Sequence, residues 1–316
     1  MKKIKIGISS CLLGNKVRFD GQHKYDPFIV ETLGGFMDFT PVCPEVECGL
    51  TVPREAMRLT GDAANPRLVT IKSGIDHTEK MQSWAKDKLK VLAQDDLCGF
   101  IFKSRSPSSG MERVKVYHEK GGTPQKTGVG IFARMFMEYF PEIPAEEEGR
   151  LYDPVLRENF IERIFVYHRW KEMLSNENTV NRLIRFHTQQ KLIIMAHSPI
   201  HYRETGKIAA SATKDNLKTV QMNYLKSMMT GLKMTATVKK NFNVLQHILG
   251  YFKKDLENAE KSEMLEVMQT YKDGLIPLIV PVTLLNHYVL KFNQHYLREQ
   301  FYLHPHPIEL KLRNHA

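Results

Sequence analysis

The first half of the chain alternates between two patterns of apolar residues. Short runs rich in β-branched and aromatic residues predict strands, at residues 4–8, 36–42, 99–102 and 114–117. Apolar residues at helical spacing predict helices between and after these strands, at residues 27–33, 78–93 and 131–139. Strands that alternate with helices are typical of an α/β layer. We therefore predict an α/β fold for this half, a Rossmann-like domain with a mainly parallel sheet.

The second half shows only the helical period. It predicts helices at residues 159–167, 179–196, 213–250 with a break near Gly231, 256–274 and 284–302. Between the halves, residues 141–149 contain two prolines, an acidic run and a glycine, a composition that favours a linker. The sequence thus predicts two domains, an N-terminal α/β domain at residues 1–145 and an all-α helical domain at residues 150–316.

Three loops that follow predicted strands carry the most unusual residues of the chain, and they span residues 9–20, 43–54 and 103–113. Right-handed crossovers place the loops after successive parallel strands at the same edge of a sheet. Ligands of open α/β sheets bind at that edge, beyond the carboxyl ends of the strands. We therefore expect these three loops to form one site.

Positive charge is distributed unevenly along the chain. The 316 residues carry a formal net charge of +10, and residues 1–150 hold 22 Lys and Arg against 20 Asp and Glu, whereas residues 151–316 hold 23 against 15. An excess of positive charge is the electrostatic footprint of phosphate binding. We expect an anionic partner on the second half; a basic surface without a partner has the same composition.

The N-terminal segment, MKKIKIGISSCLLG, contains only a short apolar run, which fits a first strand better than a signal peptide. No window of the chain approaches the roughly 18 uninterrupted apolar residues that a membrane span requires. We therefore expect a cytoplasmic protein with no membrane partner.

The four cysteines divide into two groups by their position relative to the strands. Cys11 and Cys43 follow predicted strands, and Cys48 lies in the same loop as Cys43. Cys98 begins a strand, which places it at the opposite edge of the sheet as a small buried hydrophobe. Three thiolates can hold a 4Fe–4S cluster with one iron open. Zinc with three cysteines and a water, or three unconnected cysteines, fits the same spacing.

Three motifs in these loops resemble the thiouracil desulfidase family, TudS: SSCLLG followed by VRFDG at residues 9–21, PVCPEV followed by VPR at 41–54, and KSRSPSSGMERVKVY at 103–117. The similarity covers about the first 140 residues. The motifs NFIERIFVYHRW at 159–170 and FHTQQKLIIMAHSP at 186–199 are similar to the YbgA-like helical domain. Together the two parts resemble tRNA 4-thiouridine desulfidases of the RudS type. This resemblance implies non-redox desulfuration on a 4Fe–4S cluster held by three cysteines, tRNA as the partner, and no nucleotide cofactor.

The third motif departs from the family pattern, which usually reads SPSCG. Ser109 stands where that cysteine is expected, and Cys48 stands where the family often has a small or apolar residue. We expect that the third ligand has moved to the second loop, so that Cys11, Cys43 and Cys48 hold the metal. The alternative is a damaged site in an inactive protein.

The same loops supply candidate catalytic groups. Glu45 is the best general base, because it lies two residues after Cys43; pairing with Arg54 or Arg58 is the alternative. The resemblance implies a catalytic serine in the third loop, for which Ser104 and Ser106 are the candidates. Lys103 can stabilise negative charge on the ring oxygen. Other polar residues are candidates for substrate binding, although each also suits a turn or a surface ion pair: Arg18, Asp20, Arg105, Ser108, Ser109 and Arg113.

Lysines spaced by seven or eight residues predict a basic stripe on the helix at residues 213–250. Its members are Lys218, Lys226, Lys233 and Lys240, and Lys191 and Arg203 extend the candidate RNA-binding set. Ordinary solvated lysines give the same pattern. The leading hypothesis is therefore a tRNA 4-thiouridine desulfidase. The alternatives are a desulfidase of free thiouracil or thio-nucleotides, and an RNA-binding protein whose metal site is structural or lost.

Overall fold

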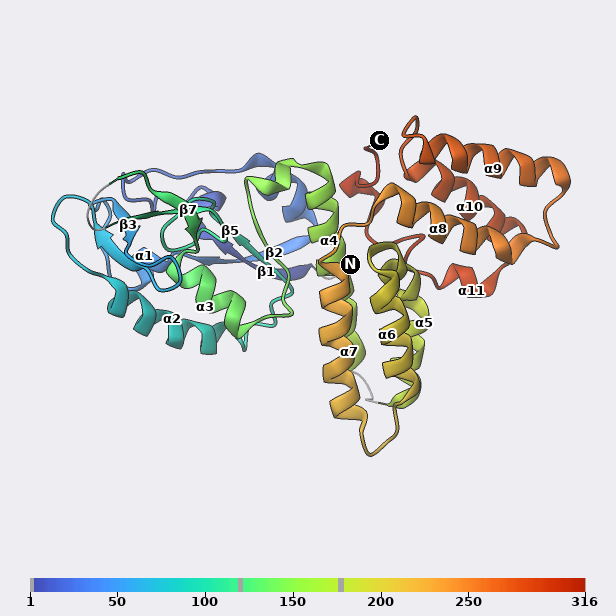
Figure 1. Cartoon of the computed structure of the whole chain (residues 1–316), viewed down its shortest axis with the longest axis horizontal. Coiled ribbons are helices and arrows are strands. Elements are labelled where there is room, and N and C mark those ends of the chain that lie inside the picture. Colours follow the sequence, from blue (N-terminus) through green and yellow to red (C-terminus); the bar gives the residue numbers. More distant parts are fainter. Residues whose placement is uncertain (1–2, 119–121, 176–178, 316) are drawn as a thin grey trace. The chain divides into compact units, whose positions relative to one another are not determined.

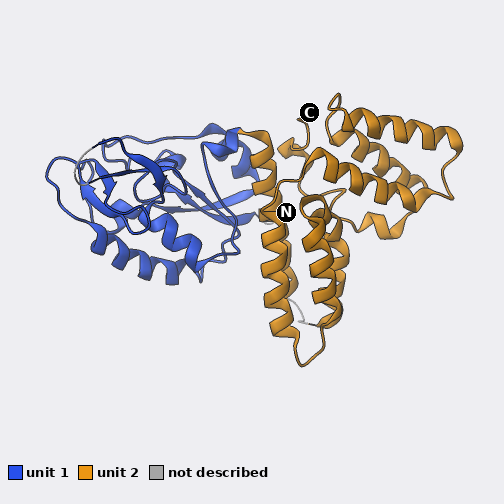
Figure 2. Ribbon diagram, viewed as in Figure 1, with its two compact units in different colours: residues 1–152 blue, residues 153–316 orange. Residues whose placement is uncertain are grey.

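The computed structural model describes residues 3–118, 122–175 and 179–315. The chain divides into two compact units, unit 1 at Met1–Tyr152 and unit 2 at Asp153–Ala316, which Figure 2 distinguishes by colour. Each unit has its own sheet or helix layers and its own apolar core. The division falls later than the boundaries predicted from the sequence, at 145 and 150.

The main sheet of unit 1 is parallel throughout. Its strands are β1 (Ile4–Ser9), β2 (Met37–Val42), β5 (Phe100–Phe102) and β8 (Ala145–Glu147), in the order β2-β1-β5-β8. β1 is the central strand that pairs with both β2 and β5, so the chain segments that leave these three strands emerge at one edge (Figure 1). The predicted parallel sheet is confirmed.

A second sheet of unit 1 is mixed. Its strands are β3 (Met57–Thr60), β4 (Arg67–Thr70), β6 (Val114–Tyr117) and β7 (Gln125–Gly128), in the order β4-β3-β6-β7. The β3–β6 pair is parallel and the two outer pairs are antiparallel. The sequence predicted β6 but not the other three strands. β7, with the sequence QKTG, has no apolar alternation from which a strand can be recognised.

Helices of unit 1 pack on these sheets. They are α1 (Pro44–Glu47), α2 (Thr78–Leu92) and α3 (Ile131–Tyr139), with 3-10 turns at Ser10–Leu13, Leu33–Gly35 and Arg150–Tyr152 and a π turn at Phe28–Thr32. The predicted helices at 78–93 and 131–139 are confirmed. α3 packs aromatic rings against β5, where the Phe100 ring lies 4.7 Å from the Phe136 ring and 4.3 Å from the Phe102 ring. This aromatic layer fixes the strand that precedes the third loop.

The predicted linker at residues 141–149 is wrong, because its acidic run forms β8. The pairs Phe100 with Ala145 and Phe102 with Glu147 extend the main sheet. Glu146 and Glu147 are buried, and each has a polar partner: the Arg150 guanidinium lies 2.6 Å from Glu146, and the Met111 amide donates to Glu147 over 2.7 Å. Buried carboxylates of this kind are tolerated because they are paired.

Unit 2 is helical. Its helices are α4 (Pro154–Ser175), α5 (Val180–His197), α6 (Pro199–Ala210), α7 (Leu217–Leu232), α8 (Val238–Leu249), α9 (Asn258–Lys272), α10 (Ile279–Lys291) and α11 (His295–Arg298), with 3-10 turns at Gly250–Phe252 and Ile308–Leu310. Trp170 of α4 stacks on Tyr224 of α7 with ring centroids 5.5 Å apart in the centre of the core. None of the described helices is long and apolar enough to cross a membrane.

Capping residues set two helix boundaries of unit 2. Pro199 starts α6, and Ser198 caps it by accepting a hydrogen bond from the His201 amide. The break predicted near Gly231 in the helix at 213–250 is confirmed: α7 ends at Leu232, and Thr237 caps a new helix by accepting from the Lys240 amide. Gly231 lies inside α7, where an added Cβ would stand 2.6 Å from the His201 Cβ, so this glycine permits α6 and α7 to approach closely.

Candidate active site

The three predicted loops meet around one cavity of about 390 Å³. The loop after β1 contributes Cys11 and Arg18, the loop after β2 contributes Cys43 and Glu45, and the loop after β5 contributes residues 103–107 and Ser109. The expectation that these loops share one edge of the parallel sheet is confirmed. The cavity lies within unit 1.

Two thiols face this cavity. Cys11 sits in the 3-10 turn after β1, which Gly14 ends with a φ of 92°, and Cys43 is the N-cap residue of α1. Both are 8% exposed and both are free thiols. Burial raises the pKa of Cys11 to about 11, against the opposing charge of Lys103. Burial likewise raises the pKa of Cys43 to about 12. Two buried thiols in one cavity are the donor chemistry that soft metals require.

Cys48 is placed differently from the other two predicted ligands. It is not part of the cavity lining; its thiol donates to the Glu45 carbonyl over 3.2 Å and packs with Leu59, Leu68 and Met81. Ser109 is buried and lines the cavity. The structure therefore brings two predicted ligands together and leaves the third thiol in the adjacent apolar cluster, one short helix away.

The described residues contain no group of three or more His, Cys, Asp and Glu that is arranged to hold a metal ion. A 4Fe–4S cluster distributes its thiolates over separate irons, so its ligands stand further apart than those of one ion. Cys98 lies at the other end of β5, where its amide donates to the Lys5 carbonyl, and it is buried as predicted.

Glu45 is held at the wall of the cavity by three contacts. Its Oε1 accepts a hydrogen bond from the Ser108 hydroxyl over 2.6 Å, and its Oε2 lies 3.5 Å from Cys43 Sγ. Arg54 Nη2 lies 3.8 Å from the same Oε2. The side chain is 13% exposed, so the carboxylate reaches the cavity without being freely solvated. The predicted alternative partner Arg58 instead stacks over the Tyr117 ring.

A chain of hydroxyls connects the cavity to Glu45. Ser106 lines the cavity, and its Oγ is 2.9 Å from the Ser108 Oγ, which in turn binds Glu45. The start of α3 fixes this loop, because the Phe132 amide donates to the Ser108 carbonyl over 2.9 Å. Gly130 allows that approach, since a Cβ there would stand 2.5 Å from the Ser108 carbonyl carbon.

Lys103 and Ser104 form a separate group with Glu148, a residue that the sequence analysis assigned to the linker. Lys103 makes an ion pair with Glu148 and donates to the Ser104 hydroxyl over 3.1 Å. The Ser104 amide and hydroxyl donate to the same carboxylate over 2.6 and 2.9 Å. Lys103 and Ser104 both line the cavity, and Glu148 orients them. Recognition of residues 145–147 as a strand would have pointed to Glu148.

The predicted substrate-binding residues separate into two sets. Arg18 and Arg105 line the cavity. Asp20 does not line it, but it pairs with Arg18 over 3.2 Å. Arg113 lies outside the cavity lining: its side chain is 78% exposed and lies beside Glu112.

Comparisons with known proteins agree with the division of the chain into two units. Residues 6–148 match the family model described as 2-thiouracil desulfurase, and residues 191–307 match the model described as protein of unknown function DUF1722. The chain joins a 2-thiouracil desulfurase domain to a DUF1722 domain.

One similar protein is the uncharacterized protein YbgA of Escherichia coli (strain K12). It is 28% identical over 153 residues, which are 48% of this chain and 90% of that protein. A solved structure of a 4Fe–4S-dependent thiouracil desulfidase, TudS, is 29% identical with a TM-score of 0.40; the match covers 48% of this chain and 95% of that one.

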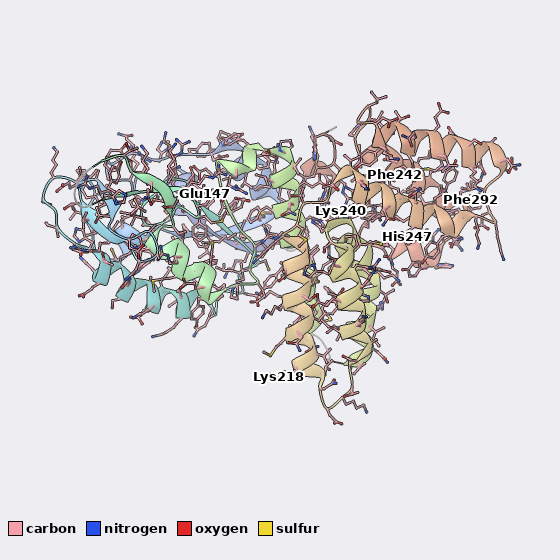
Figure 3. All side chains as sticks on the ribbon, in the orientation of Figure 1. Glu147, Lys218, Lys240, Phe242, His247 and Phe292 are labelled. Atoms are coloured by element: carbon pink, nitrogen blue, oxygen red, sulfur yellow. The ribbon has the colours of Figure 1, made fainter. Side chains whose placement is uncertain are left out.

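The basic residues predicted to bind RNA all lie in unit 2, but they do not form one stripe. Lys218, Lys226 and Lys233 are exposed on or at the end of α7, and Arg203 is exposed on α6. Lys191 lies over the Tyr296 ring, in the DUF1722 domain. Lys240 belongs to α8, and its Nζ donates to the carbonyls of His197 and Thr235 over 2.7 and 2.9 Å. Figure 3 labels Lys218 and Lys240, which lie on different helices. The predicted stripe of four lysines is wrong because the helix ends before Lys240.

Proposed function

We propose that this protein removes sulfur from a thiolated uracil, and that its substrate is 4-thiouridine in tRNA. The observation that carries the proposal is one cavity in which two free thiols, a carboxylate and a chain of hydroxyls meet. That cavity lies in the part of the chain that matches the 2-thiouracil desulfurase family. The loops that build it also carry the three motifs that resemble the desulfidases.

The proposed cofactor is a 4Fe–4S cluster, and two of the three thiols that it needs face the cavity. Cys11 and Cys43 supply two buried thiols at the cavity. For the third ligand we propose Cys48, because iron–sulfur clusters are held by thiolates and Cys48 is the nearest thiol along the chain to Cys43. Ser109, which faces the cavity, is the competing donor. The charges of Lys103 and Arg18 beside Cys11, and of Arg54 beside Cys43, partly oppose the rise in thiol pKa that burial causes.

With one iron open, a bound cluster supplies a Lewis acid for the sulfur of the substrate. Glu45 would accept a proton from the water that adds to the ring carbon, after which the C–S bond breaks and the sulfur leaves as hydrosulfide; one Glu45 oxygen faces Cys43 and the other is held by Ser108. The hydroxyls of Ser106 and Ser108 orient that carboxylate and provide a path by which its proton leaves toward the cavity. Of the two candidate serines, Ser106 is the one connected to Glu45.

Other residues position the substrate. Lys103, held by Glu148, offers its ammonium to the ring oxygen, and Ser104 keeps that ammonium in place. Arg18 and Arg105 supply positive charge at the cavity for ribose and phosphate. The excess of basic residues in the second half, 23 against 15, supports a polyanionic substrate rather than a free base.

The test is desulfuration by anaerobically purified, cluster-reconstituted protein. Thiolated bulk tRNA is incubated with the protein, digested, and its nucleosides are separated by chromatography. We expect loss of 4-thiouridine with equal gain of uridine. Parallel reactions with free 2-thiouracil, free 4-thiouracil and 4-thiouridine monophosphate distinguish the second candidate, a desulfidase of small substrates. Unchanged 4-thiouridine in tRNA, with a fully loaded cluster, contradicts the tRNA proposal.

A further inference from the structure

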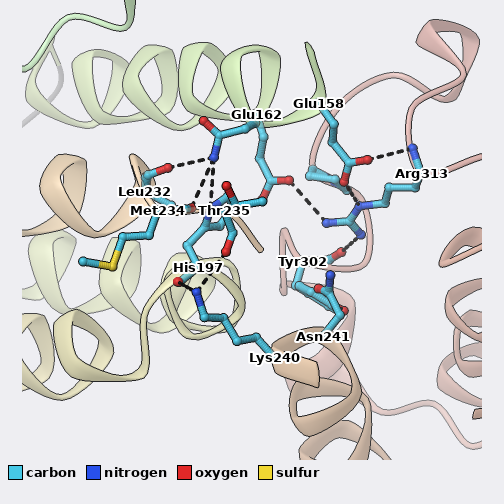
Figure 4. A network of polar contacts seen from close by, with 12 residues as sticks. Glu158, Glu162, His197, Leu232, Met234, Thr235, Lys240, Asn241, Tyr302 and Arg313 are labelled. Carbon is cyan, nitrogen blue, oxygen red and sulfur yellow. Dashed lines mark hydrogen bonds and ion pairs between the residues drawn. The ribbon is translucent and has the colours of Figure 1, made fainter. Parts of the chain in front are cut away.

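Unit 2 contains a cavity of its own, of about 260 Å³, with buried charges in its wall (Figure 4). These charges pair with one another. Arg313 Nη2 lies 3.5 Å from Glu162 Oε2, and His197 Nε2 lies 3.5 Å from Glu162 Oε1. Buried charges are tolerated in a core when they are paired in this way, so the stability of unit 2 accounts for the network. The feature that points outward lies at the cavity of unit 1.

The apolar part of the unit 1 cavity is exposed at one residue, Phe19, which is 43% accessible to solvent. It is also the only aromatic residue among the described residues that line this cavity. The other apolar residues of the lining are buried or half-buried: Val17, Val42, Pro44, Ala56, Met57 and Pro107. A single exposed apolar side chain is ordinary on a convex surface. At the mouth of a cavity, an aromatic ring is a surface that a planar ligand can cover as it enters.

Hydrogen bonds hold the backbone of Phe19 in place. The Phe19 carbonyl accepts from the Arg54 amide over 2.9 Å, and the Val17 carbonyl accepts from Arg54 Nη1 over 3.0 Å. The turn closes at Gly21, whose amide donates to the Arg18 carbonyl over 3.0 Å and whose φ of 74° suits glycine. Phe19 is therefore presented by a turn that is fixed on both sides.

The same contacts connect Phe19 to the reacting end of the cavity. The Cys43 thiol donates to the Val17 carbonyl over 3.8 Å, and Arg54 Nη2 lies 3.8 Å from Glu45 Oε2. Two residues of chain span at most about 7 Å, so the Phe19 backbone lies within that distance of Val17. This span is comparable to a pyrimidine ring with its exocyclic groups. A ring whose sulfur reaches the thiols therefore extends toward Phe19.

Positive charge at the mouth of the cavity fits the remainder of a nucleotide. Arg18 Cζ lies 5.5 Å from the centre of the Phe19 ring, and Asp20 fixes the Arg18 guanidinium over 3.2 Å. Lys24 and Arg105 are exposed and line the same cavity. Arg105 has a φ of 60°, an uncommon backbone conformation that clusters at ligand sites. An aromatic ring among cations is the combination with which proteins bind unpaired nucleotides, by stacking on the base and attracting the phosphate.

We propose that Phe19 is a substrate-binding residue, on whose ring the thiolated uracil stacks while its sulfur points toward Cys11 and Cys43. This proposal rests on the function proposed above and adds the group that holds the face of the base. The face of a uracil has no hydrogen-bonding groups, so stacking takes up the face and leaves the edge of the ring to Lys103 and the serines. Because every base has such a face, Phe19 supplies affinity and orientation, and the sulfur is recognised elsewhere in the cavity.

Substitutions at Phe19 separate stacking from simple apolar contact. Phe19→Tyr and Phe19→Trp keep an aromatic face, whereas Phe19→Leu keeps an apolar side chain without one. We expect Phe19→Leu and Phe19→Ala to weaken binding of the base about tenfold or more, and the two aromatic variants to stay within about threefold of the wild type. A residue that only supported the fold would respond to side-chain volume, and Trp would then be tolerated less well than Leu.

Binding of a product nucleotide measures the effect without the reaction. Uridine monophosphate is titrated by anaerobic calorimetry into the full-chain, cluster-reconstituted protein and into each variant. Initial rates with 4-thiouridine monophosphate give the second readout: Phe19→Leu should raise KM about tenfold with a smaller change in kcat, because stacking holds substrate and transition state alike. Tyr139→Ala is the matched control. Tyr139 is 51% exposed at the end of α3, outside the cavity lining, so its removal should leave both readouts unchanged.

This proposal and the proposed function fail in different ways. A wild-type protein that binds uridine monophosphate through Phe19 but desulfurises no thiolated uracil contradicts the function and supports the stacking. A wild-type protein that desulfurises its substrate, with equal affinity and equal KM in Phe19→Leu and Phe19→Tyr, overturns the stacking and leaves the function. Absence of uridine monophosphate binding by the wild-type protein overturns the stacking as well, as does an equal loss of affinity in Tyr139→Ala and Phe19→Ala.

Discussion

Single residues decide which atoms hold the proposed cluster. Cys11 and Cys43 share the cavity, whereas Cys48 faces an apolar cluster and Ser109 faces the cavity. If thiolates hold the cluster, Cys48→Ser removes most of the iron after anaerobic reconstitution and Ser109→Ala retains it. Iron content and the visible absorbance of the cluster measure both variants.

Cys98→Ser is the matched control for this experiment, because Cys98 is equally buried but lies at the other end of β5. It is expected to bind iron as the wild type does. Loss of iron in Ser109→Ala with full iron in Cys48→Ser would instead assign the serine as the third ligand.

Glu45 can be separated from the metal ligands by experiment. Glu45→Gln keeps the size of the side chain and removes the proton acceptor, so we expect a loss of desulfuration of about 10²-fold or more with unchanged iron content. Initial rates with thiolated tRNA measure it. Glu79→Gln is the control, because Glu79 is exposed in the first turn of α2 and is not part of the cavity lining. Equal losses in both variants would show that Glu45 acts only through the fold.

The sequence located Cys11, Cys43 and Glu45 because each follows a strand in a distinctive motif. It could not show that Ser106 and Ser108 reach Glu45, since 63 residues separate Ser108 from its partner and a serine-rich turn has the same local pattern. Nor could it show which way the Cys48 side chain points, because that depends on packing against β3 and α2.

At the scale of helices, the role of Gly231 depends on how closely α6 and α7 pack. The sequence predicted a helix break near it, and α7 ends one residue later at Leu232; what the sequence could not show is that the glycine accommodates His201 of α6. Gly231→Ala would place a Cβ 2.6 Å from the His201 Cβ and 2.9 Å from its Cγ. We expect destabilisation by about 1–3 kcal/mol, measured by urea unfolding.

Gly250→Ala is the control for this change, because the structure places nothing within 4 Å of its added Cβ. It should leave the free energy of unfolding unchanged or raise it slightly, since alanine restricts the unfolded chain. Equal destabilisation by the two substitutions would contradict the packing argument.

Element boundaries were predicted where local signals agreed with the final packing. The helices at 78–92 and 131–139 have regular apolar faces, and the sequence located them to within a residue. β8 was missed because the two prolines and the acidic run around it are linker signals, while its pairing with β5 and the partners of its carboxylates come from distant parts of the chain. Thr237 was missed because the helical period continues across the break.

The stability of unit 2 should depend on pH through half-buried histidines. Burial, together with the charge of Lys191, lowers the pKa of His187 from 6.5 to about 4. Between pH 6.5 and pH 4 the unfolded chain therefore binds a proton at His187 that the folded unit does not bind. The free energy of unfolding is highest above pH 6.5 and falls as the pH drops toward 4. Between pH 7 and pH 5 we expect unit 2 to lose about 1–2 kcal/mol from this group.

Urea unfolding of a Trp84→Phe protein measures this loss, because Trp170 then reports on unit 2 alone. His187→Gln in the same background should lower stability at pH 7, where the contact with the Tyr224 hydroxyl is lost, and flatten the pH dependence. Half-buried His306, whose pKa desolvation also lowers to about 4, retains part of the dependence. An unchanged slope in His187→Gln would contradict the assignment.

Binding of tRNA by the whole molecule can be read from its dependence on salt. Lys218, Lys226 and Lys233 are exposed on or beside one helix, whereas the Lys240 ammonium is committed to two backbone carbonyls. Each lysine that contacts a phosphate releases counterions, so removing all three exposed lysines should lower the salt slope of log K by about two to three. Lys253→Gln, Lys254→Gln and Lys261→Gln together are the control, with an equal change of net charge at exposed positions around the start of α9. If both triple variants lower the slope equally, net charge rather than the α7 surface attracts the RNA, and the positioning of tRNA must be sought on another face of unit 2.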